Sequence, residues 1–289
     1  MKGRTGNRDS RVSSVSFLRQ LLAEHGIAPR KRWGQNFLID RRMLDKLVAG
    51  ISPQPDDKIV EIGPGPGVLT RALAMAGSQV LAVDIDGRFE SVLLEVLGDY
   101  AEHLDFHQGD ALAFDFLAHG ADKVVGNLPY YITSPLLFRL LKPREIPKSM
   151  VFMVQLEVAE RICASPGRKN YGVLSVVCGY RTDRRLLFKV PPSSFWPQPD
   201  VHSAAVKLEV AAGSWLPQIV EPHFFRVVEA AFSQRRKTLT NSLAPLELER
   251  CRLREALASS GVDPRCRAEQ LSVGDFCRLT LALYGNDAR

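Results

Sequence analysis

The feature that most constrains this chain is a glycine-rich stretch at residues 60–70, with the sequence Val-Glu-Ile-Gly-Pro-Gly-Pro-Gly-Val-Leu-Thr. Apolar residues lead into three glycines at alternate positions, and an apolar pattern of helical spacing follows. This order predicts a strand, a tight turn and the start of a helix. Backbone without Cβ atoms can approach a ligand closely there, and the first N–H groups of the helix can face it. A plain tight turn would also explain the stretch.

Two further stretches narrow the choice of ligand among a phosphate, NAD and S-adenosylmethionine. Residues 80–86 form an apolar run that ends in acids, and Asp84 lies seventeen residues after Gly67. A doubly wound fold places a carboxylate for ribose hydroxyls at about this distance, which suits both NAD and S-adenosylmethionine. Residues 124–131 run from an apolar strand pattern into Asn-Leu-Pro-Tyr. That tetrapeptide resembles the signature of methyltransferases that act on exocyclic amines, especially the adenine amine, and favours S-adenosylmethionine.

Apolar runs that alternate with helical patterns predict the fold class. We expect strands at residues 58–62, 79–84, 104–109, 123–126, 149–155 and 204–210, and helices at 15–25, 43–49, 134–141 and 157–164. Two more apolar segments follow, at residues 173–180 and 184–190. This rhythm predicts an α/β domain whose mainly parallel sheet is covered on both faces.

The chain divides into three predicted parts. Residues 1–14 are a basic arm expected to be disordered, and residues 15–210 form the α/β domain. Residues 211–289 begin with a linker-like Ala-Ala-Gly-Ser and then show only helical patterns, at 224–232, 239–243, 246–257 and 273–284. We expect this last part to be a small all-helical domain that docks the substrate.

The distribution of charge indicates a polyanionic partner. The chain carries a net charge of +6, and residues 1–42 alone hold ten Lys/Arg against three acids. A second basic cluster, Gln-Arg-Arg-Lys at residues 234–237, lies far away in sequence. A solubilising tail and a solvated helix end are the alternatives, but two separate clusters favour RNA.

Other classes of protein are disfavoured by composition. The longest apolar runs suit short strands, so we expect no membrane-spanning helix, and the polar, basic start lacks the apolar region of a secretory signal. Five scattered cysteines without a Cys-x-x-Cys pair indicate reduced thiols in the cytoplasm. We expect no metal site, because residues 104–108 follow a strand pattern that would hold His103 and His107 far apart.

Five motifs occur in the order found in the ribosomal RNA adenine dimethyltransferases. They are the glycine turn, Gly-Gln-Asn-Phe-Leu at 34–38, Asn-Leu-Pro-Tyr at 127–130, Phe-x-Pro-x-Pro-x-Val-x-Ser at 195–203, and Phe-Ser-Gln-Arg-Arg-Lys-Thr-Leu at 232–239. Over residues 30–285 the chain resembles the small-subunit members of that family, of the KsgA/RsmA type. The resemblance implies a Rossmann-like class I S-adenosylmethionine-dependent methyltransferase domain followed by a small all-helical domain. Asp84 stands where the family more often has Glu.

The same resemblance implies an activity. An enzyme of this type transfers two methyl groups from S-adenosylmethionine to each of two adjacent adenosines near the 3′ end of 16S, small-subunit rRNA. We therefore expect the partner to be this rRNA within a pre-30S-like particle, the place of action to be the cytoplasm, and the enzyme to be a monomer with no membrane partner.

Residues 127–130 suit this chemistry. The lone pair of an adenine amine is delocalised into the ring, so acceptors aimed at its two hydrogens favour a pyramidal nitrogen that can attack a methyl sulfonium. Asn127 offers a side-chain carbonyl, and Pro129 restricts Leu128 to an extended backbone, so that a main-chain carbonyl can supply the second acceptor. Catalysis then rests on positioning and placed dipoles. Tyr130 would stack on the flipped base, and the family pattern places Phe195 on its other face; ordinary core positions are the alternatives for both rings.

The predicted site residues fall into three groups. The catalytic group is Asn127, Leu128, Pro129, Tyr130 and Phe195. The cofactor group is Gln35, Asn36, Leu38, Glu61, Gly63, Gly65, Gly67, Asp84, Asp110 and Asn127. The RNA-binding group is Arg30, Lys31, Arg32, Arg235, Arg236 and Lys237. Within the cofactor group, Glu61 is expected to receive the methionine ammonium or only to cap the loop. Asp110 is expected to bind the adenine amine or to cap a helix, and Gln35 and Asn36 are expected to line the methionine end or only to form a turn.

Three other functions remain open. A nonenzymatic ribosome assembly factor could use this fold as a platform, although it would not need an intact glycine turn or tetrapeptide. A dinucleotide-dependent oxidoreductase would not need the amine-acceptor motif. A large-subunit rRNA adenine methylase of the Erm type is the alternative within the methyltransferases, and the long match at residues 232–239 favours the small-subunit type.

Overall fold

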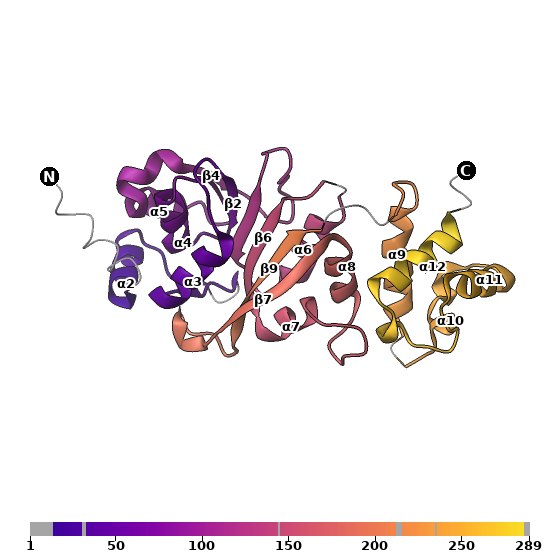
Figure 1. The fold of residues 1–289 in the computed structure, drawn as a ribbon. Helices are drawn as coiled ribbons and strands as arrows, with labels where there is room; N and C mark the ends of the chain where they lie inside the picture. The colour runs from indigo at the N-terminus through magenta and orange to yellow at the C-terminus, as the bar shows by residue number, and fades with distance from the viewer. Residues whose placement is uncertain (1–13, 31–32, 144, 212–215, 235, 286–289) are drawn as a thin grey trace. The chain divides into compact units, whose positions relative to one another are not determined.

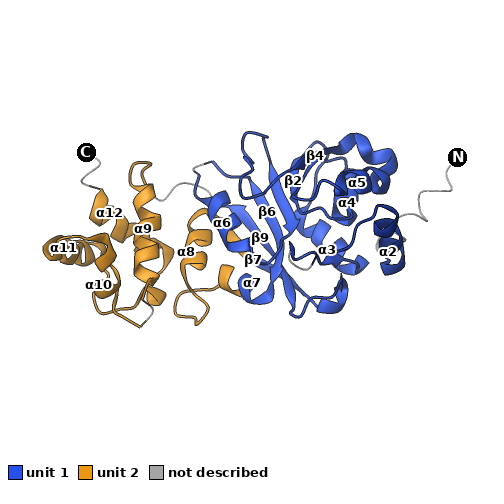
Figure 2. Cartoon of the chain, turned by 180° about the vertical axis from the view of Figure 1, so that it is seen from behind, with its two compact units in different colours: residues 1–159, 185–210 blue, residues 160–184, 211–289 orange. Residues whose placement is uncertain are grey.

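The computed structural model describes residues 14–30, 33–143, 145–211, 216–234 and 236–285. The chain forms two compact units, one made of residues 1–159 and 185–210 and the other of residues 160–184 and 211–289 (Figure 2). The second unit thus takes in a segment that the sequence placed in the α/β domain. Most of the expected basic arm and the expected linker at 212–214 lie outside the described residues. The predicted division at residue 210 stays a prediction.

Within the described residues, the α/β unit is built on a seven-stranded sheet with the order β4-β3-β2-β5-β6-β9-β7 (Figure 1). Its strands are β2 (Lys58–Ile62), β3 (Gln79–Asp84), β4 (Leu104–Gln108), β5 (Lys123–Asn127), β6 (Ser149–Gln155), β7 (Thr182–Val190) and β9 (Ser203–Val210). β2 pairs in parallel with β3 and β5, whereas β9 runs antiparallel to β6. A separate antiparallel pair joins β1 (Phe37–Leu38) to β8 (Phe195–Trp196). The expected α/β fold with a mainly parallel sheet is confirmed.

Burial on both faces explains why the central strands are continuous apolar runs. In β6, the side chains of Ser149 to Val154 are all buried. Val151 and Met153 belong to the core cluster that also holds residues of α2 (Val15–Glu24), α3 (Arg41–Ile51), α4 (Val68–Met75) and α5 (Phe89–Leu97). Phe152 is equally buried but lies outside that cluster. Because side chains alternate along a strand, it faces the other side of the sheet.

Two further helices follow in the chain, α6 (Thr133–Leu141) and α7 (Leu156–Ile162). The helix expected at residues 43–49 is longer at both ends. It starts earlier because Asp40 caps α3 by accepting hydrogen bonds from the backbone N–H groups of Arg42 and Met43, and it ends at Ile51, before a left-handed Ser52. None of the helices in the described part of the chain is both long enough and apolar enough to cross a bilayer.

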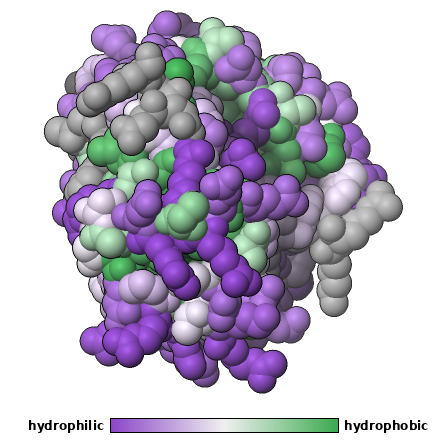
Figure 3. All heavy atoms as spheres, turned by 90° about the vertical axis from the view of Figure 1, so that its right-hand side faces the viewer, coloured by the Kyte–Doolittle hydropathy of each residue, from purple (hydrophilic) through white to green (hydrophobic). Residues whose placement is uncertain are grey.

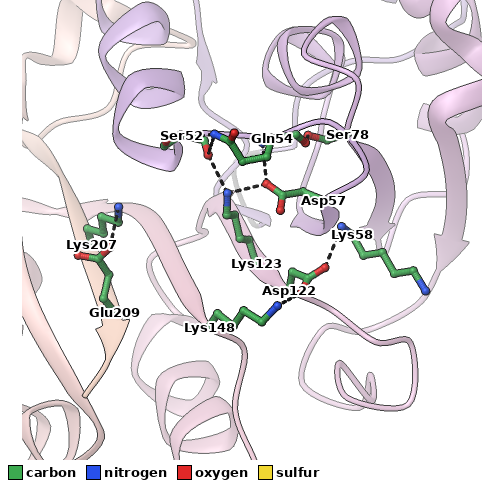
Figure 4. Close-up of polar contacts among 10 residues, drawn as sticks. All are labelled: Ser52, Gln54, Asp57, Lys58, Ser78, Asp122, Lys123, Lys148, Lys207 and Glu209. Carbon is green, nitrogen blue, oxygen red and sulfur yellow. Dashed lines mark hydrogen bonds and ion pairs between the residues drawn. The ribbon is translucent and has the colours of Figure 1, made fainter. Parts of the chain in front are cut away.

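Ion pairs hold together the amino ends of the parallel strands (Figure 4). The Lys123 ammonium at the start of β5 lies 2.5 Å from Asp57 and donates to the Ser52 carbonyl at 2.7 Å. The Asp122 carboxylate accepts from Lys148, just before β6, at 2.6 Å. These contacts hold the amino ends of the strands in place, at the edge of the sheet opposite to the carboxyl ends.

The second unit is helical, as expected. Its helices are α8 (Val173–Arg181), α9 (Glu221–Phe232), α10 (Leu239–Ser242), α11 (Arg250–Ser260) and α12 (Val273–Tyr284). The helix expected at residues 246–257 is wrong at its start. A 3₁₀ turn occupies Ala244–Leu246 and Glu247 has a left-handed backbone, with φ 54°, so the α-helix begins only at Arg250.

Candidate active site

The carboxyl ends of β2, β3 and β5 adjoin an open cavity of about 690 Å³. In the sheet, β3 lies on one side of β2 and β5 lies on the other, so the strand order reverses at β2. Ligands of open α/β sheets bind at such a reversal. The predicted site residues that line this cavity are Gln35, Asn36, Gly63, Gly65, Asp84, Asp110, Asn127 and Pro129. Sequence stretches about ninety residues apart therefore meet here.

The glycine turn is shaped by left-handed backbone. Gly63, Gly65 and Gly67 have φ values of 64°, 52° and 83°, which residues with a Cβ rarely adopt. A Cβ on Gly65 would lie 2.8 Å from the Phe37 ring. Gly67 does not line the cavity; a Cβ there would lie 2.7 Å from Leu93, so its absence allows α4 to pack against α5. Two of the three glycines thus border the ligand space, and the third serves helix packing.

Asp84, the last residue of β3, presents a buried carboxylate to the cavity. Its Oδ1 accepts a hydrogen bond from the Asp86 backbone N–H at 2.9 Å. Burial raises the pKa of Asp84 to about 6, although the Asp86 N–H opposes the rise. The backbone N–H groups of Gly65 and Ile85 also lower this pKa. A buried carboxylate at the edge of the cavity suits the hydroxyls of a ribose.

Glu61 lies deeper, with 2% of its surface exposed. Burial raises its pKa to about 7; the nearby Thr70 hydroxyl lowers it in part, and the Asp84 charge raises it further. Glu61 Oε2 has no hydrogen-bond partner among the described residues. Glu61 lines a second cavity of about 400 Å³ that shares Phe37, Gly63 and Asn127 with the first. A cationic group would satisfy this oxygen and remove the penalty of burying it.

Residues 127–130 begin at the last residue of β5; Asn127 lines both cavities, and Pro129 lines the first. The Asn127 amide Nδ2 donates to the main-chain carbonyl of Asn36 at 2.6 Å. The Leu128 side chain is 1% exposed and belongs to the core. The Leu128 carbonyl accepts no hydrogen bond within the described chain, whereas the Pro129 carbonyl accepts one from the Ile132 N–H at 3.1 Å. The main-chain acceptor still available is therefore that of Leu128.

The two predicted stacking rings differ in position. Tyr130 is half-buried, and its hydroxyl lies 3.3 Å from the Ser203 hydroxyl. Phe195 is 3% exposed, pairs with Leu38 across β1 and β8, and belongs to the hydrophobic core. Neither Tyr130 nor Phe195 lines the cavity. The stacking roles of Tyr130 and Phe195 stay predictions.

Three other cofactor residues occupy distinct positions. The Gln35 side chain accepts from the Arg30 backbone N–H at 2.8 Å, which closes a turn beside the cavity. Asp110 accepts from the Leu112 N–H at 2.8 Å in a turn that no helix follows, so it caps no helix, and it lines the cavity. Leu38 lies in the wall of the second cavity.

The cavity wall also contains residues outside the predicted site set, among them two that are largely exposed. Ile85 and Tyr131 line it and remain 49% and 59% exposed. Each directly follows a predicted site residue, and that adjacency was the available signal. No group of three or more His, Cys, Asp or Glu side chains in the described residues could hold a metal ion.

The predicted RNA-binding residues lie in both units. Arg30 stacks over the Trp33 ring at 4.3 Å, whereas Lys31, Arg32 and Arg235 lie outside the described residues. Arg236 and Lys237 are exposed between α9 and α10.

Two other segments of the second unit adjoin this cluster. The Leu239 N–H donates to the Cys266 carbonyl at 2.8 Å, and the Gly167 N–H donates to the Glu269 carbonyl at 2.7 Å. These bonds connect segments whose exposed cations the sequence reasoning did not assign. We call the combined set the basic surface: Arg168, Lys169, Arg236, Lys237, Arg265 and Arg267.

The model of the ribosomal RNA adenine dimethylase family matches residues 27–284. The chain belongs to this family. Among its relatives is a ribosomal RNA small subunit methyltransferase A from Desulfitobacterium hafniense, 44% identical over 279 residues, which cover 95% of this chain and 99% of the relative. The protein of that name from Pelotomaculum thermopropionicum is also 44% identical and covers 93% of this chain and 96% of the relative.

Solved structures agree with the assignment to the dimethylase family. A dimethyladenosine transferase from Plasmodium falciparum has a TM-score of 0.74 and 28% identity, covering 87% of this chain and 98% of that one. The 23S rRNA methyltransferase ErmE has a TM-score of 0.68 and 27% identity, covering 86% and 99%. The chain is thus an S-adenosylmethionine-dependent rRNA adenine dimethyltransferase with a class I methyltransferase fold.

The residues present fit this methyl donor. The orphaned Glu61 oxygen suits the methionine ammonium, the backbone of Gly63 and Gly65 leaves room for the ligand, and Asp84 suits the ribose.

Proposed function

We propose that this enzyme dimethylates the N6 amines of two adjacent adenosines near the 3′ end of small-subunit rRNA. The observation that carries the proposal is the pair of acceptors at the end of β5, Asn127 Oδ1 and the Leu128 carbonyl, beside the cavity that suits S-adenosylmethionine. The relatives described above are named for the small subunit, which supports this choice of substrate.

The chain's own residues supply position and polarity. S-adenosylmethionine brings an electrophilic methyl group on a sulfonium. In the first transfer, Asn127 Oδ1 and the Leu128 carbonyl accept the two amine hydrogens, which turns the nitrogen lone pair toward the methyl group. In the second transfer, one of these acceptors holds the single hydrogen that remains. These dipoles are placed before the reaction begins and gain strength as the nitrogen becomes pyramidal. The methylated aminium is acidic and gives its proton to water, so no strong base has to come from the chain.

The target base has to leave its stack to reach the cavity. We assign the first stacking face to Tyr130, which is half-buried and follows Pro129 of the cavity wall in the chain. Stacking on an aromatic side chain contributes about 1–3 kcal/mol per base. Phe195 is buried and pairs with Leu38, so it can take the second face only if the β1–β8 pair shifts.

RNA docking is assigned to the second unit. Its basic surface gathers exposed cations from three segments, which suits contacts to phosphates. On the side of the C-terminal helices, hydrophilic side chains cover most of the visible face (Figure 3). A polar, cationic face suits RNA better than an apolar protein partner. We place the enzyme on a pre-30S-like particle in the cytoplasm, acting as a monomer without a membrane partner.

Site mapping tests the proposal. The protein is incubated with labelled S-adenosylmethionine and either unmethylated small subunits or unmethylated large subunits, and the modified nucleotides are mapped. We expect two neighbouring dimethyladenosines near the 3′ end of the small-subunit rRNA and none in the large subunit. Label in large-subunit rRNA alone would favour the Erm-type alternative. Stable binding to the particle without label transfer would favour an assembly factor.

A further inference from the structure

The orientation of the Asn127 carboxamide is set by a neighbouring backbone. Its Nδ2 lies 2.6 Å from the main-chain carbonyl oxygen of Asn36. A carbonyl oxygen can only accept, so the NH₂ group must face Asn36. Oδ1 is left as the acceptor of this side chain, and it has no hydrogen-bond partner among the described residues.

The Asn36 carbonyl is itself held in place. The Asn36 side chain donates to the Gly34 carbonyl at 3.2 Å, which closes a turn over residues 34–36. Gly34 has φ 63°, and a Cβ on it would lie 3.3 Å from Pro129 Cβ. The next residue, Phe37, is buried and pairs with Trp196 in the β1–β8 sheet. The turn is therefore packed against residues 127–130 on one side and joined to the core on the other.

We propose that the Asn36 main-chain carbonyl is a positioning group for methyl transfer, which holds Asn127 Oδ1 toward the target amine and makes a carboxamide necessary at position 127. The inference rests on the proposed function, because the amine it serves is that of the substrate adenine. It gives the 34–36 turn a role separate from contact with the cofactor.

A carboxylate at position 127 shows what the carbonyl requires. Ionised, it would place an anionic oxygen against the Asn36 carbonyl oxygen, and the two would repel each other. The side chain would then turn away from its productive orientation. A protonated carboxyl group has one O–H donor and one carbonyl acceptor, so it can reproduce both contacts of the amide. Asn127→Asp should therefore be active only in its protonated form, and its rate should rise as the pH falls.

The test compares Asn127→Asp with Asn127→Ala, which lacks both the donor and the acceptor. Single-turnover methylation of small subunits is measured from about pH 5.5 to 8.5 at saturating S-adenosylmethionine, so that pH effects on cofactor binding do not enter. Near pH 8 we expect both variants to be slower than wild type by about a hundredfold or more. The ratio of the Asp rate to the Ala rate should then climb toward low pH, by up to about tenfold per unit while the carboxyl remains mostly ionised.

Other outcomes are distinguishable. A ratio that is flat or rises with pH would overturn the inference, since the carboxylate would then serve as an acceptor or a base. Loss of S-adenosylhomocysteine binding in Asn127→Asp would also overturn it, because the slow rate would then come from a lost cofactor contact and not from a misplaced acceptor. If wild type labels no adenine at any pH, the proposed function fails instead. If Asn127 had a merely structural role, the methylation rates of both variants would fall, and the two rates would have the same pH dependence.

Discussion

At the level of single residues, the site concentrates its buried charge on two carboxylates. Burial raises the pKa of Glu61 from 4.5 to about 7 and that of Asp84 from 3.8 to about 6. Without ligand, both groups hold their protons more tightly in the folded chain than in the unfolded chain. Their contribution to stability is therefore lost as the pH rises from about 4 to about 7, and ligand binding has to favour the ionised forms.

We predict that the affinity for S-adenosylmethionine falls as the pH drops below about 7, because the methionine ammonium binds ionised Glu61. The loss should approach about tenfold per pH unit for one carboxylate. Calorimetry between about pH 5.5 and 7.5 measures it, and the same titration in two buffers reports the protons released. Glu61→Gln is the control: it should bind more weakly and keep only the dependence below about pH 6 that belongs to Asp84. An unchanged Kd for wild type across this range would contradict the assignment.

A second prediction concerns the contact between Tyr130 and Ser203. If this bond orients the stacking ring, then Tyr130→Phe and Ser203→Ala should each slow single-turnover methylation by about fivefold, equivalent to roughly 1 kcal/mol. The double variant should be no slower than either single one.

Ser149→Ala is the matched control for that experiment. Ser149 is also a buried serine of the β6–β9 pair, and its hydroxyl has no partner among the described residues, so its loss should leave the rate unchanged. Additive losses from Tyr130→Phe and Ser203→Ala would mean that the hydroxyls act separately.

At the level of elements, the short β1–β8 pair closes one side of the glycine turn. Phe37 of β1 contacts Phe89 of α5, with ring centroids 5.9 Å apart, and fills the space next to Gly65. The sequence indicated that Gln35 and Asn36 line the methionine end or form a turn, but it contained no sign of a strand pair. Two residues are too few to show a periodic pattern, and their partners lie more than 150 residues away.

Gly65→Ala should therefore disturb both the fold and the ligand. Its φ of 52° costs about 1–2 kcal/mol for a residue with a Cβ, and the new methyl group would press on the Phe37 ring. We expect a lower unfolding free energy and at least about tenfold weaker binding of S-adenosylhomocysteine, measured by denaturant titration and calorimetry.

Gly120→Ala separates backbone strain from contact with the ligand. Gly120 has φ 65°, and a Cβ on it would meet only the Lys58 side chain, at 3.8 Å. Gly120→Ala should lower the unfolding free energy by a similar amount, because its backbone is strained in the same way, and it should leave the affinity for S-adenosylhomocysteine unchanged. Equal ligand affinity in Gly65→Ala and wild type would mean that the turn does not approach the cofactor.

At the level of the whole molecule, the chemistry and the basic surface lie in different compact units. All the residues that line the cavity belong to the α/β unit, and the basic surface belongs to the helical unit. Substitutions in the basic surface should therefore leave cofactor binding intact, and substitutions in the cavity should leave the basic surface intact.

Charge reversal tests this division. The double variant Arg236→Glu/Arg267→Glu should weaken binding to small subunits and reduce the slope of log K against log salt by about 0.7–0.9 for each phosphate that the variant no longer neutralises. Filter binding across a salt series gives the slopes, and the affinity for S-adenosylmethionine should not change. Arg250→Glu/Arg254→Glu, which reverses two exposed charges on α11, is the matched control. Equal slopes for the two double variants would mean that the basic surface binds no phosphate.

The sequence by itself determined the fold class and the positions of the motifs. Continuous apolar runs fixed β2, β3 and β6 to the residue, because buried parallel strands leave a strong local pattern. Glycines at positions of positive φ and a carboxylate at a strand end are likewise local signals, so the cofactor residues could be predicted from the sequence. The secondary structure of residues 173–180 could not be predicted, because a short apolar run does not distinguish a helix from a buried strand.

Only the tertiary structure decided how the motifs meet. The bond from Asn127 to Asn36 joins residues 91 apart, and the basic surface assembles three segments whose individual charges look ordinary in sequence. The burial of Phe195 follows from its pairing with Leu38, not from its own motif. Side-chain orientation, burial and pKa depend on neighbours that chain folding brings together. A sequence pattern records only the local part of that environment.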